Sequence, residues 1–180
     1  MSKLVAPHGG SGLKALLAPR TQRAELLARA RGLTKVPMTS REVSDVLMMA
    51  MGAYTPIEGF MGKGSWRRVC LDMKLKNGVF WPIPITLSCE KILADSIHVE
   101  EEVALVDGQS GEILAIMEVT EKYAPDKILE CEHVYRTKDA AHPGVKKVLE
   151  QGEINLAGRV TCLSEGDYPK KFPDLYIRPA

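Results

Sequence analysis

The first third of the chain carries apolar residues at intervals of three and four, the spacing of one face of an α-helix. Leu13, Leu16 and Leu17 begin this pattern, which predicts helical structure from residue 13 to residue 33. We expect Thr21 to cap the second part of that stretch and Gly32 to end it.

A stronger helical signal follows at residues 39–52. Thr39 and Glu42 have the spacing of a capping box, in which each side chain accepts a hydrogen bond from the other residue's backbone N–H. An apolar stripe runs from Val43 to Met51, and Gly52 offers a left-handed end to the helix. After this helix, residues 52–61 hold too many turn-forming residues for a regular element, so we expect an ordered loop.

Alternation replaces helical spacing after the tight turn predicted at Asn77-Gly78. Residues 79–87 place every second apolar side chain on one face, which predicts an extended strand. Pro82 and Pro84 remove two N–H groups from the same side of it, so this strand is expected at a sheet edge. Just before the turn, Ser65 is expected to cap a short helix.

The second half of the chain reads as strands with short helices between them. Residues 103–107 and 112–120 predict a hairpin, 125–135 a helix, and Pro143 the first turn of another helix. A last strand is expected over 154–162, interrupted by Gly158. This order predicts an α+β fold with a mostly antiparallel sheet or a small barrel.

Composition narrows the class of protein. The chain has 180 residues, 45% hydrophobic and 26% charged, with a net charge of +1. These values fit one soluble globular domain with at most an appendage, and they exclude a disordered chain, a collagen or a coiled coil. A nearly neutral chain has no bulk attraction to nucleic acid or to an anionic membrane. Leu4-Val5-Ala6 is too short for a signal peptide, and no apolar run could span a membrane, so we expect the cytoplasm.

Glycine-rich stretches raise the question of phosphate binding. Gly59–Ser65 comes near the P-loop pattern, but Ile57 stands where its first glycine belongs and Gly64 separates the lysine from the serine. The stretches 9–12 and 108–111 lack the preceding strand or fit a hairpin turn. We therefore favour turns for all three.

No catalytic, cofactor-binding or metal-ligating residue can be assigned from spacing. The chain has four histidines, none within ligand spacing of another. Cys131, Glu132 and His133 are adjacent, but on a helix such neighbours face different directions and cannot share one metal. The four cysteines form no C-x-x-C pair and are expected to be reduced core thiols.

Distinctive stretches follow one another along the chain: Pro7-His8-Gly9-Gly10, Gly52 to Met61, Gly78 to Leu87, Val134-Tyr135-Arg136-Thr137 with His142-Pro143-Gly144-Val145, and Leu175 to Ala180. Each alone is weak. In this order and spacing they resemble the N-terminal domain of bacterial ATP sulfurylases (sulfate adenylyltransferases).

The resemblance implies a PUA-like, mostly antiparallel β-barrel with N-terminal and inserted short helices over residues 1–165. Residues 166–180 would be an irregular linker toward an absent catalytic domain. It also implies a parent reaction in which a sulfate oxygen attacks the α-phosphorus of ATP with the help of Mg²⁺, giving adenosine 5′-phosphosulfate and pyrophosphate. The family's catalytic segment, Gln-x-Arg-Asn-Pro-x-His-x-x-His, does not occur here, so this chain alone is expected to be inactive.

A domain without catalytic groups can still support the catalytic domain or a contact between subunits of a homo-oligomer. The loop 52–61 is our candidate surface, with Tyr54, Phe60 and Met61 as domain-interface residues. The competing interpretation is a loop packed inside this domain.

Two alternatives remain. One is a stand-alone PUA-like binding module with an RNA or protein partner and no enzyme activity, although the near-neutral charge argues against nucleic acid. The other is a subunit that pairs with a separately encoded catalytic chain.

Overall fold

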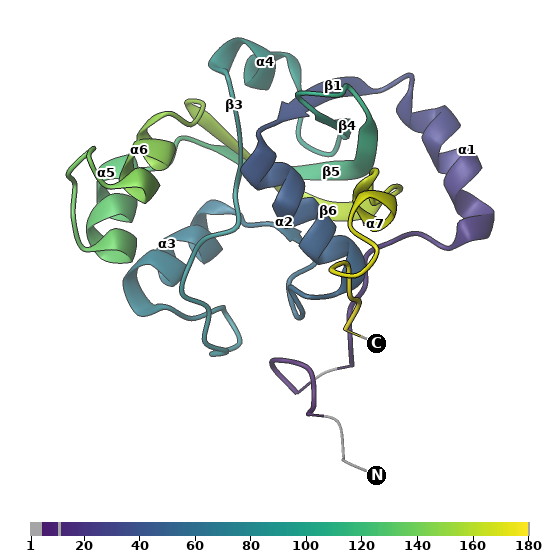
Figure 1. Cartoon of the computed structure of the whole chain (residues 1–180). Coiled ribbons are helices and arrows are strands. Elements are labelled where there is room, and N and C mark those ends of the chain that lie inside the picture. The colour runs from purple at the N-terminus through teal and green to yellow at the C-terminus, as the bar shows by residue number, and fades with distance from the viewer. Residues whose placement is uncertain (1–4, 11, 180) are drawn as a thin grey trace. The chain divides into compact units, whose positions relative to one another are not determined.

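The computed structural model describes residues 5–10 and 12–179 (Figure 1). Leu4, Ser11 and Ala180, on which some of the expectations above fall, lie outside the described residues. Contacts divide the chain into two compact units. The first comprises Met1–Gly59, Glu102–Glu118 and Arg159–Ala180, and the second comprises Phe60–Glu101 and Val119–Gly158.

The helices are α1 (Arg20–Ala30), α2 (Ser40–Met51), α3 (Lys63–Asp72), α4 (Lys91–Ser96), α5 (Lys127–Glu130), the π-helical turn η1 (Cys131–Tyr135), α6 (Pro143–Leu149) and α7 (Tyr168–Lys171). The strands are β1 (Thr34–Met38), β2 (Gly59–Phe60), β3 (Leu87–Cys89), β4 (Glu102–Asp107), β5 (Ile113–Tyr123) and β6 (Ile154–Cys162). No described helix has both the length and the apolar character that a membrane crossing requires.

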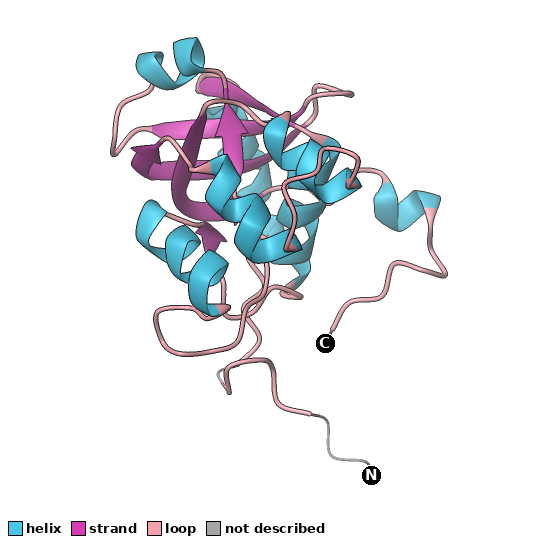
Figure 2. Cartoon of the chain, turned by 90° about the vertical axis from the view of Figure 1, so that its left-hand side faces the viewer, coloured by secondary structure: helices cyan, strands magenta, loops and turns pink. Residues whose placement is uncertain are grey.

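The six strands form one open sheet in the order β1-β4-β5-β6-β2, with β3 also paired to β6. Figure 2 shows the strands in magenta and the helices in cyan. Strands β4 and β5 are antiparallel, as are β3 and β6, whereas β1 runs parallel to β4. The mixture of helices and a sheet is confirmed, but the predicted β-barrel is wrong. The path ends at β1, which contains Pro37, and at β2, which has two residues. A proline at an edge and a two-residue strand provide too few N–H groups to close a sheet.

The core of the first unit lies between α1 and the β4–β5 hairpin. Small residues make the contact: Ala18, Ala30 and Ala104 pack with Ile116 and Leu163. Their size lets the helix backbone approach the sheet closely. Leucines of α1 and the turn after it cover the edges of this cluster.

The second unit has two apolar clusters. One joins Trp66 and Cys70 of α3 to Tyr123 of β5, and the Trp66 indole N–H donates to the Glu130 carboxylate at 2.6 Å. The other packs Cys131 against α6. Cys70, Cys89, Cys131 and Cys162 are all buried free thiols, which confirms the prediction of reduced core cysteines.

Locally encoded elements are confirmed. The Thr39–Glu42 capping box is present in both directions, and Gly52 ends α2 with φ of 84°. The hairpin of β4 and β5 and the helix that starts at Pro143 also form as predicted. In α6 the side chain of His142 accepts hydrogen bonds from the backbone N–H groups of the first turn, so this histidine is a helix cap.

Other expectations are wrong. Residues 13–19 are extended, and the helix begins at Arg20 after Pro19, not at Leu13. Helix α3 starts at Lys63, so Ser65 is not its cap. The predicted strand 79–87 does not form: only Leu87, the first residue of β3, belongs to a strand, Ile83 is exposed, and the alternation does not match burial.

Strand β6 passes through Gly158 without interruption. Strand β1 and helix α4 were not predicted at all. Strand β1 is only five residues long and contains Pro37, and α4 is too short to show a helical period.

The capping box gives a first prediction. Replacing Thr39 by Ala removes the hydroxyl that receives the Glu42 N–H and donates to the buried Glu42 carboxylate at 2.7 Å. We expect the free energy of unfolding to fall by about 1–2 kcal/mol. Urea denaturation measures it, with Ser44→Ala on the exposed side of the same helix as the control. A loss of equal size in both variants would contradict the role of the cap.

Candidate functional site

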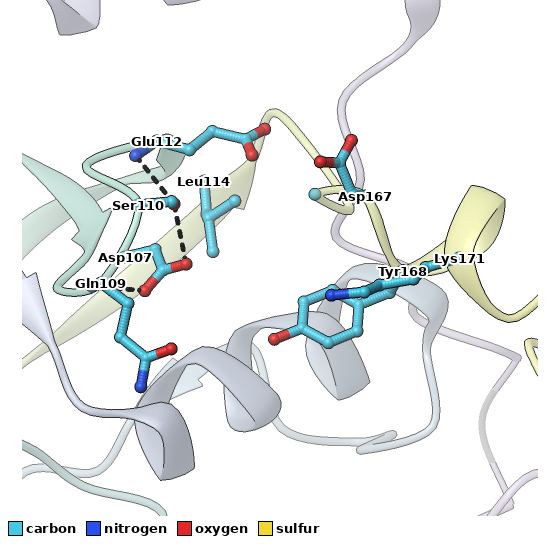
Figure 3. Close-up of a pocket in the computed structure, with 9 residues that line it drawn as sticks. Asp107, Gln109, Ser110, Glu112, Leu114, Asp167, Tyr168 and Lys171 are labelled. Carbon is cyan, nitrogen blue, oxygen red and sulfur yellow. Dashed lines mark hydrogen bonds between the residues drawn. The ribbon is translucent and has the colours of Figure 1, made fainter.

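A pocket of about 300 Å³ opens between the β4–β5 turn and the start of α7 (Figure 3). On one side, Asp107 organises the turn, because its carboxylate accepts the Gln109 backbone N–H at 2.9 Å and the Ser110 hydroxyl at 2.8 Å. These hydrogen bonds, the Gln109 N–H first, hold the pKa of Asp107 below its usual range. Asp107 is therefore an ionised turn residue.

The opposite wall of the pocket comes from the segment after β6. Asp167, Tyr168 and Lys171 line it, and Figure 3 shows the last two across the opening from the turn. In addition, the Ser164 hydroxyl donates to the Glu112 carboxylate at 2.5 Å. The carboxylates that hydrogen-bond here serve the local backbone, and no described residues gather three or more His, Cys, Asp or Glu side chains in a way that could hold a metal ion.

The predicted interface residues lie in different surroundings. Phe60 and Met61 are 4% and 6% exposed, so this chain already buries both side chains. Tyr54 is half-buried, and its hydroxyl donates to Asp45 at 3.0 Å. Tyr54 belongs to the first unit, whereas Phe60 and Met61 belong to the second. The packed-loop interpretation accounts for Phe60 and Met61, while an interface role for the three stays a prediction.

Asp45, beside this loop, is an acidic residue in an unusual environment. It is buried on α2, and desolvation raises its pKa to about 6 despite the Arg41 guanidinium 3.5 Å away. Burial and the adjacent Asp45 charge likewise raise the pKa of Tyr54, so its hydroxyl remains a donor. Spacing alone could not identify Asp45, because its burial depends on how α2 packs.

Glu58 lies between two cations within the first unit. Lys14 and Arg159 both donate to its carboxylate, and these interactions, the Lys14 hydrogen bond first, lower its pKa. The three side chains line a second opening next to β5 and β6. Because the side chains are partly exposed, this ion-pair network adds little stability.

The glycine-rich stretch Gly59–Ser65 contains the start of α3, where a bound phosphate would have to sit. Glu121 occupies that position: its carboxylate accepts the Lys63 backbone N–H at 3.1 Å. A Cβ built on Gly62 would lie 2.3 Å from the same carboxylate oxygen. The Glu121 carboxylate therefore occupies the place that an anion would take at the start of α3.

A family model described as a PUA-like domain matches residues 5–165, so the chain belongs to the PUA-like domain family. The curated relatives are more specific. The sulfate adenylyltransferase of Syntrophobacter fumaroxidans is 54% identical over 182 residues, covering 100% of this chain and 44% of that protein. That of Thiobacillus denitrificans is 48% identical over 180 residues, with the same coverage.

The chain thus spans less than half the length of these relatives, and the match falls in their N-terminal part. A solved structure described as a hexameric APS kinase from Thiobacillus denitrificans superposes with a TM-score of 0.72 at 28% identity, over 98% of this chain and 30% of that chain. The resemblance drawn from the five sequence stretches is confirmed at the level of the family and of the relatives' names.

The buried state of Phe60 can be tested directly. Phe60→Ala should lower the free energy of unfolding by about 3–5 kcal/mol, because it leaves a cavity in the core. The matched control is Phe80→Ala, at a phenylalanine that is 55% exposed, where we expect a loss below about 1 kcal/mol. Urea unfolding of both variants decides; similar small losses would return Phe60 to the interface interpretation.

Asp45 gives a pH-dependent prediction. Its pKa is about 6 in the folded chain and 3.8 in the unfolded one, so between these values the folded state binds more protons. The contribution of Asp45 to the free energy of unfolding is therefore fully present below about pH 4 and is lost as the pH rises through about 6.

Asp45→Asn should remove this loss, which is at most about 3 kcal/mol. Chemical unfolding at pH 4, 5, 6 and 7 measures it, with the exposed Asp95→Asn as the control. If the free energies of unfolding of the wild type and Asp45→Asn differ by the same amount at every pH, the burial of a charged Asp45 is contradicted.

Proposed function

We propose that this chain is the N-terminal, non-catalytic domain of a sulfate adenylyltransferase, which converts ATP and sulfate into adenosine 5′-phosphosulfate and pyrophosphate. The observation that supports this most is the 54% identity to the Syntrophobacter fumaroxidans enzyme along the whole chain. In this proposal ATP and Mg²⁺ bind to the catalytic domain, and the residues of the present chain support that domain. Residues 166–180 connect the two.

The chemistry of the chain supports such a supporting role. Carboxylates that hydrogen-bond at the pocket, at Glu58 and at the start of α3 satisfy backbone N–H groups, hydroxyls or cations of this same domain. They are therefore engaged in holding the fold. A homo-oligomer is part of the proposal, since the structural neighbour is described as hexameric.

The test is a graft. This chain replaces the matched part of the Syntrophobacter fumaroxidans enzyme, and ATP formation from adenosine 5′-phosphosulfate and pyrophosphate is measured. We expect the graft to keep activity within about tenfold of the parent, a change of about 1.4 kcal/mol in barrier. The isolated chain and the isolated remainder of the parent enzyme serve as controls.

Two results would contradict the proposal. One is ATP formation by the isolated 180-residue chain, which would mean that it holds a catalytic site. The other is a folded graft without activity. If the isolated chain instead binds RNA with an affinity that falls steeply with salt, the binding-module alternative takes its place.

A further inference from the structure

The segment after α7 contains two side chains that bind the domain and two aliphatic side chains that are exposed to solvent. Tyr176 and Arg178 both reach Glu165: the Tyr176 hydroxyl donates at 3.1 Å, and the Arg178 guanidinium donates through Nε at 3.1 Å and Nη2 at 2.5 Å. Between and before them, Leu175 and Ile177 are 78% and 77% exposed. Alternate residues are thus anchored to the domain or presented to solvent.

The anchor is stronger than a typical surface ion pair. The Glu165 side chain is only 9% exposed, and the arginine binds it with both N–H groups, the geometry that gives the strongest charged hydrogen bonds. The guanidinium also lies 5.8 Å from the centre of the Tyr176 ring. Burial first, then the charge of Glu165, raises the pKa of Tyr176 to about 12, so its hydroxyl keeps the proton that it donates.

The base of the segment is fixed as well. The backbone N–H groups of Leu163 and Ser164 both donate to the Leu114 carbonyl of β5, at 2.8 and 3.2 Å. Glu165 follows directly, so its carboxylate is positioned by the sheet. The segment, drawn in yellow beyond α7 in Figure 1, therefore holds Leu175 and Ile177 in place. A single exposed aliphatic residue is ordinary, but two within one anchored segment offer a preorganised apolar contact.

We propose that Leu175 and Ile177 are the docking contact for the catalytic domain of sulfate adenylyltransferase. This inference rests on the proposed function. The relatives favour this occupant, because their match covers 100% of this chain while more than half of their own length lies beyond it. Four residues span at most about 14 Å, so polypeptide that continues past residue 180 starts within that distance of Ile177. A covalently linked partner so close has a high effective concentration.

The experiment uses the active graft described above. Leu175→Ser with Ile177→Ser removes the contact, and tryptic cleavage after Lys171 reports how well the segment is covered. We expect cleavage at least about tenfold faster than in the unmodified graft, since re-exposing one large aliphatic side chain is worth at least about that factor. Ile92→Ser, at a residue that is 88% exposed on α4, is the matched control and should cleave at the unmodified rate.

A second variant separates the anchor from the contact. Glu165→Gln keeps both aliphatic side chains but replaces the carboxylate that holds Tyr176 and Arg178. Its cleavage rate should lie between those of the unmodified graft and the double serine variant. If Glu165→Gln has no effect while the double variant does, the contact stands and the anchoring role is withdrawn.

Other results overturn the contact itself. In the isolated chain, the double serine variant should keep the melting temperature; a fall of several degrees would place both residues in the packing of this domain. If the isolated chain self-associates in sedimentation and the double variant does not, the occupant is a second copy. An inactive unmodified graft removes the proposed function together with this occupant, whereas an active graft with unchanged cleavage removes the docking contact alone.

Discussion

The buried C-terminal end of α2 is the constraint on which the first unit depends. Its last carbonyls have no partner within the helix, and a buried carbonyl without a donor is costly. The Met49 carbonyl accepts the N–H groups of Gly52 at 3.1 Å and Leu16 at 3.0 Å, and the Ala50 carbonyl accepts the Leu17 N–H at 3.3 Å. The same strip pairs with the end of β6, because the Cys162 N–H donates to the Leu16 carbonyl at 2.9 Å. One stretch of extended backbone therefore joins the central helix to the sheet.

This constraint also explains the largest error of the sequence analysis. The spacing of Leu13, Leu16 and Leu17 predicts a helical face, but Leu13 is exposed, and spacing cannot show which backbone partner their N–H groups take. A helix there would use the N–H groups that α2 and β6 require. The fit is close at the other side too, since a Cβ on Gly52 would lie 2.9 Å from Leu13 Cγ. Gly52 therefore both ends α2 and leaves room for the side chain of Leu13.

The elements that sequence predicts well are those whose cause is local. The Thr39–Glu42 box, the Asp107 turn and the helix after His142 each depend on side chains within a few residues. Strand β1 depends instead on β4, some seventy residues later, and its parallel register from Thr34↔Val103 leaves no trace in its own composition. The open sheet follows from the same non-local pairing. The barrel, which the resemblance implies and the order of elements also allows, does not close because β1 contains Pro37 and β2 has only two residues.

The features of the candidate site also divide into those that the sequence predicts and those that only the fold shows. Sequence could exclude a P-loop at Gly59–Ser65 by spacing, but only the fold shows that Glu121 takes the place of the anion. It could not find Glu165, because the residues that make this carboxylate important, Tyr176 and Arg178, follow more than ten positions later in a stretch that reads as an irregular linker. The Glu165 carboxylate, which follows the end of β6, fixes the path of the chain through its bonds to Tyr176 and Arg178.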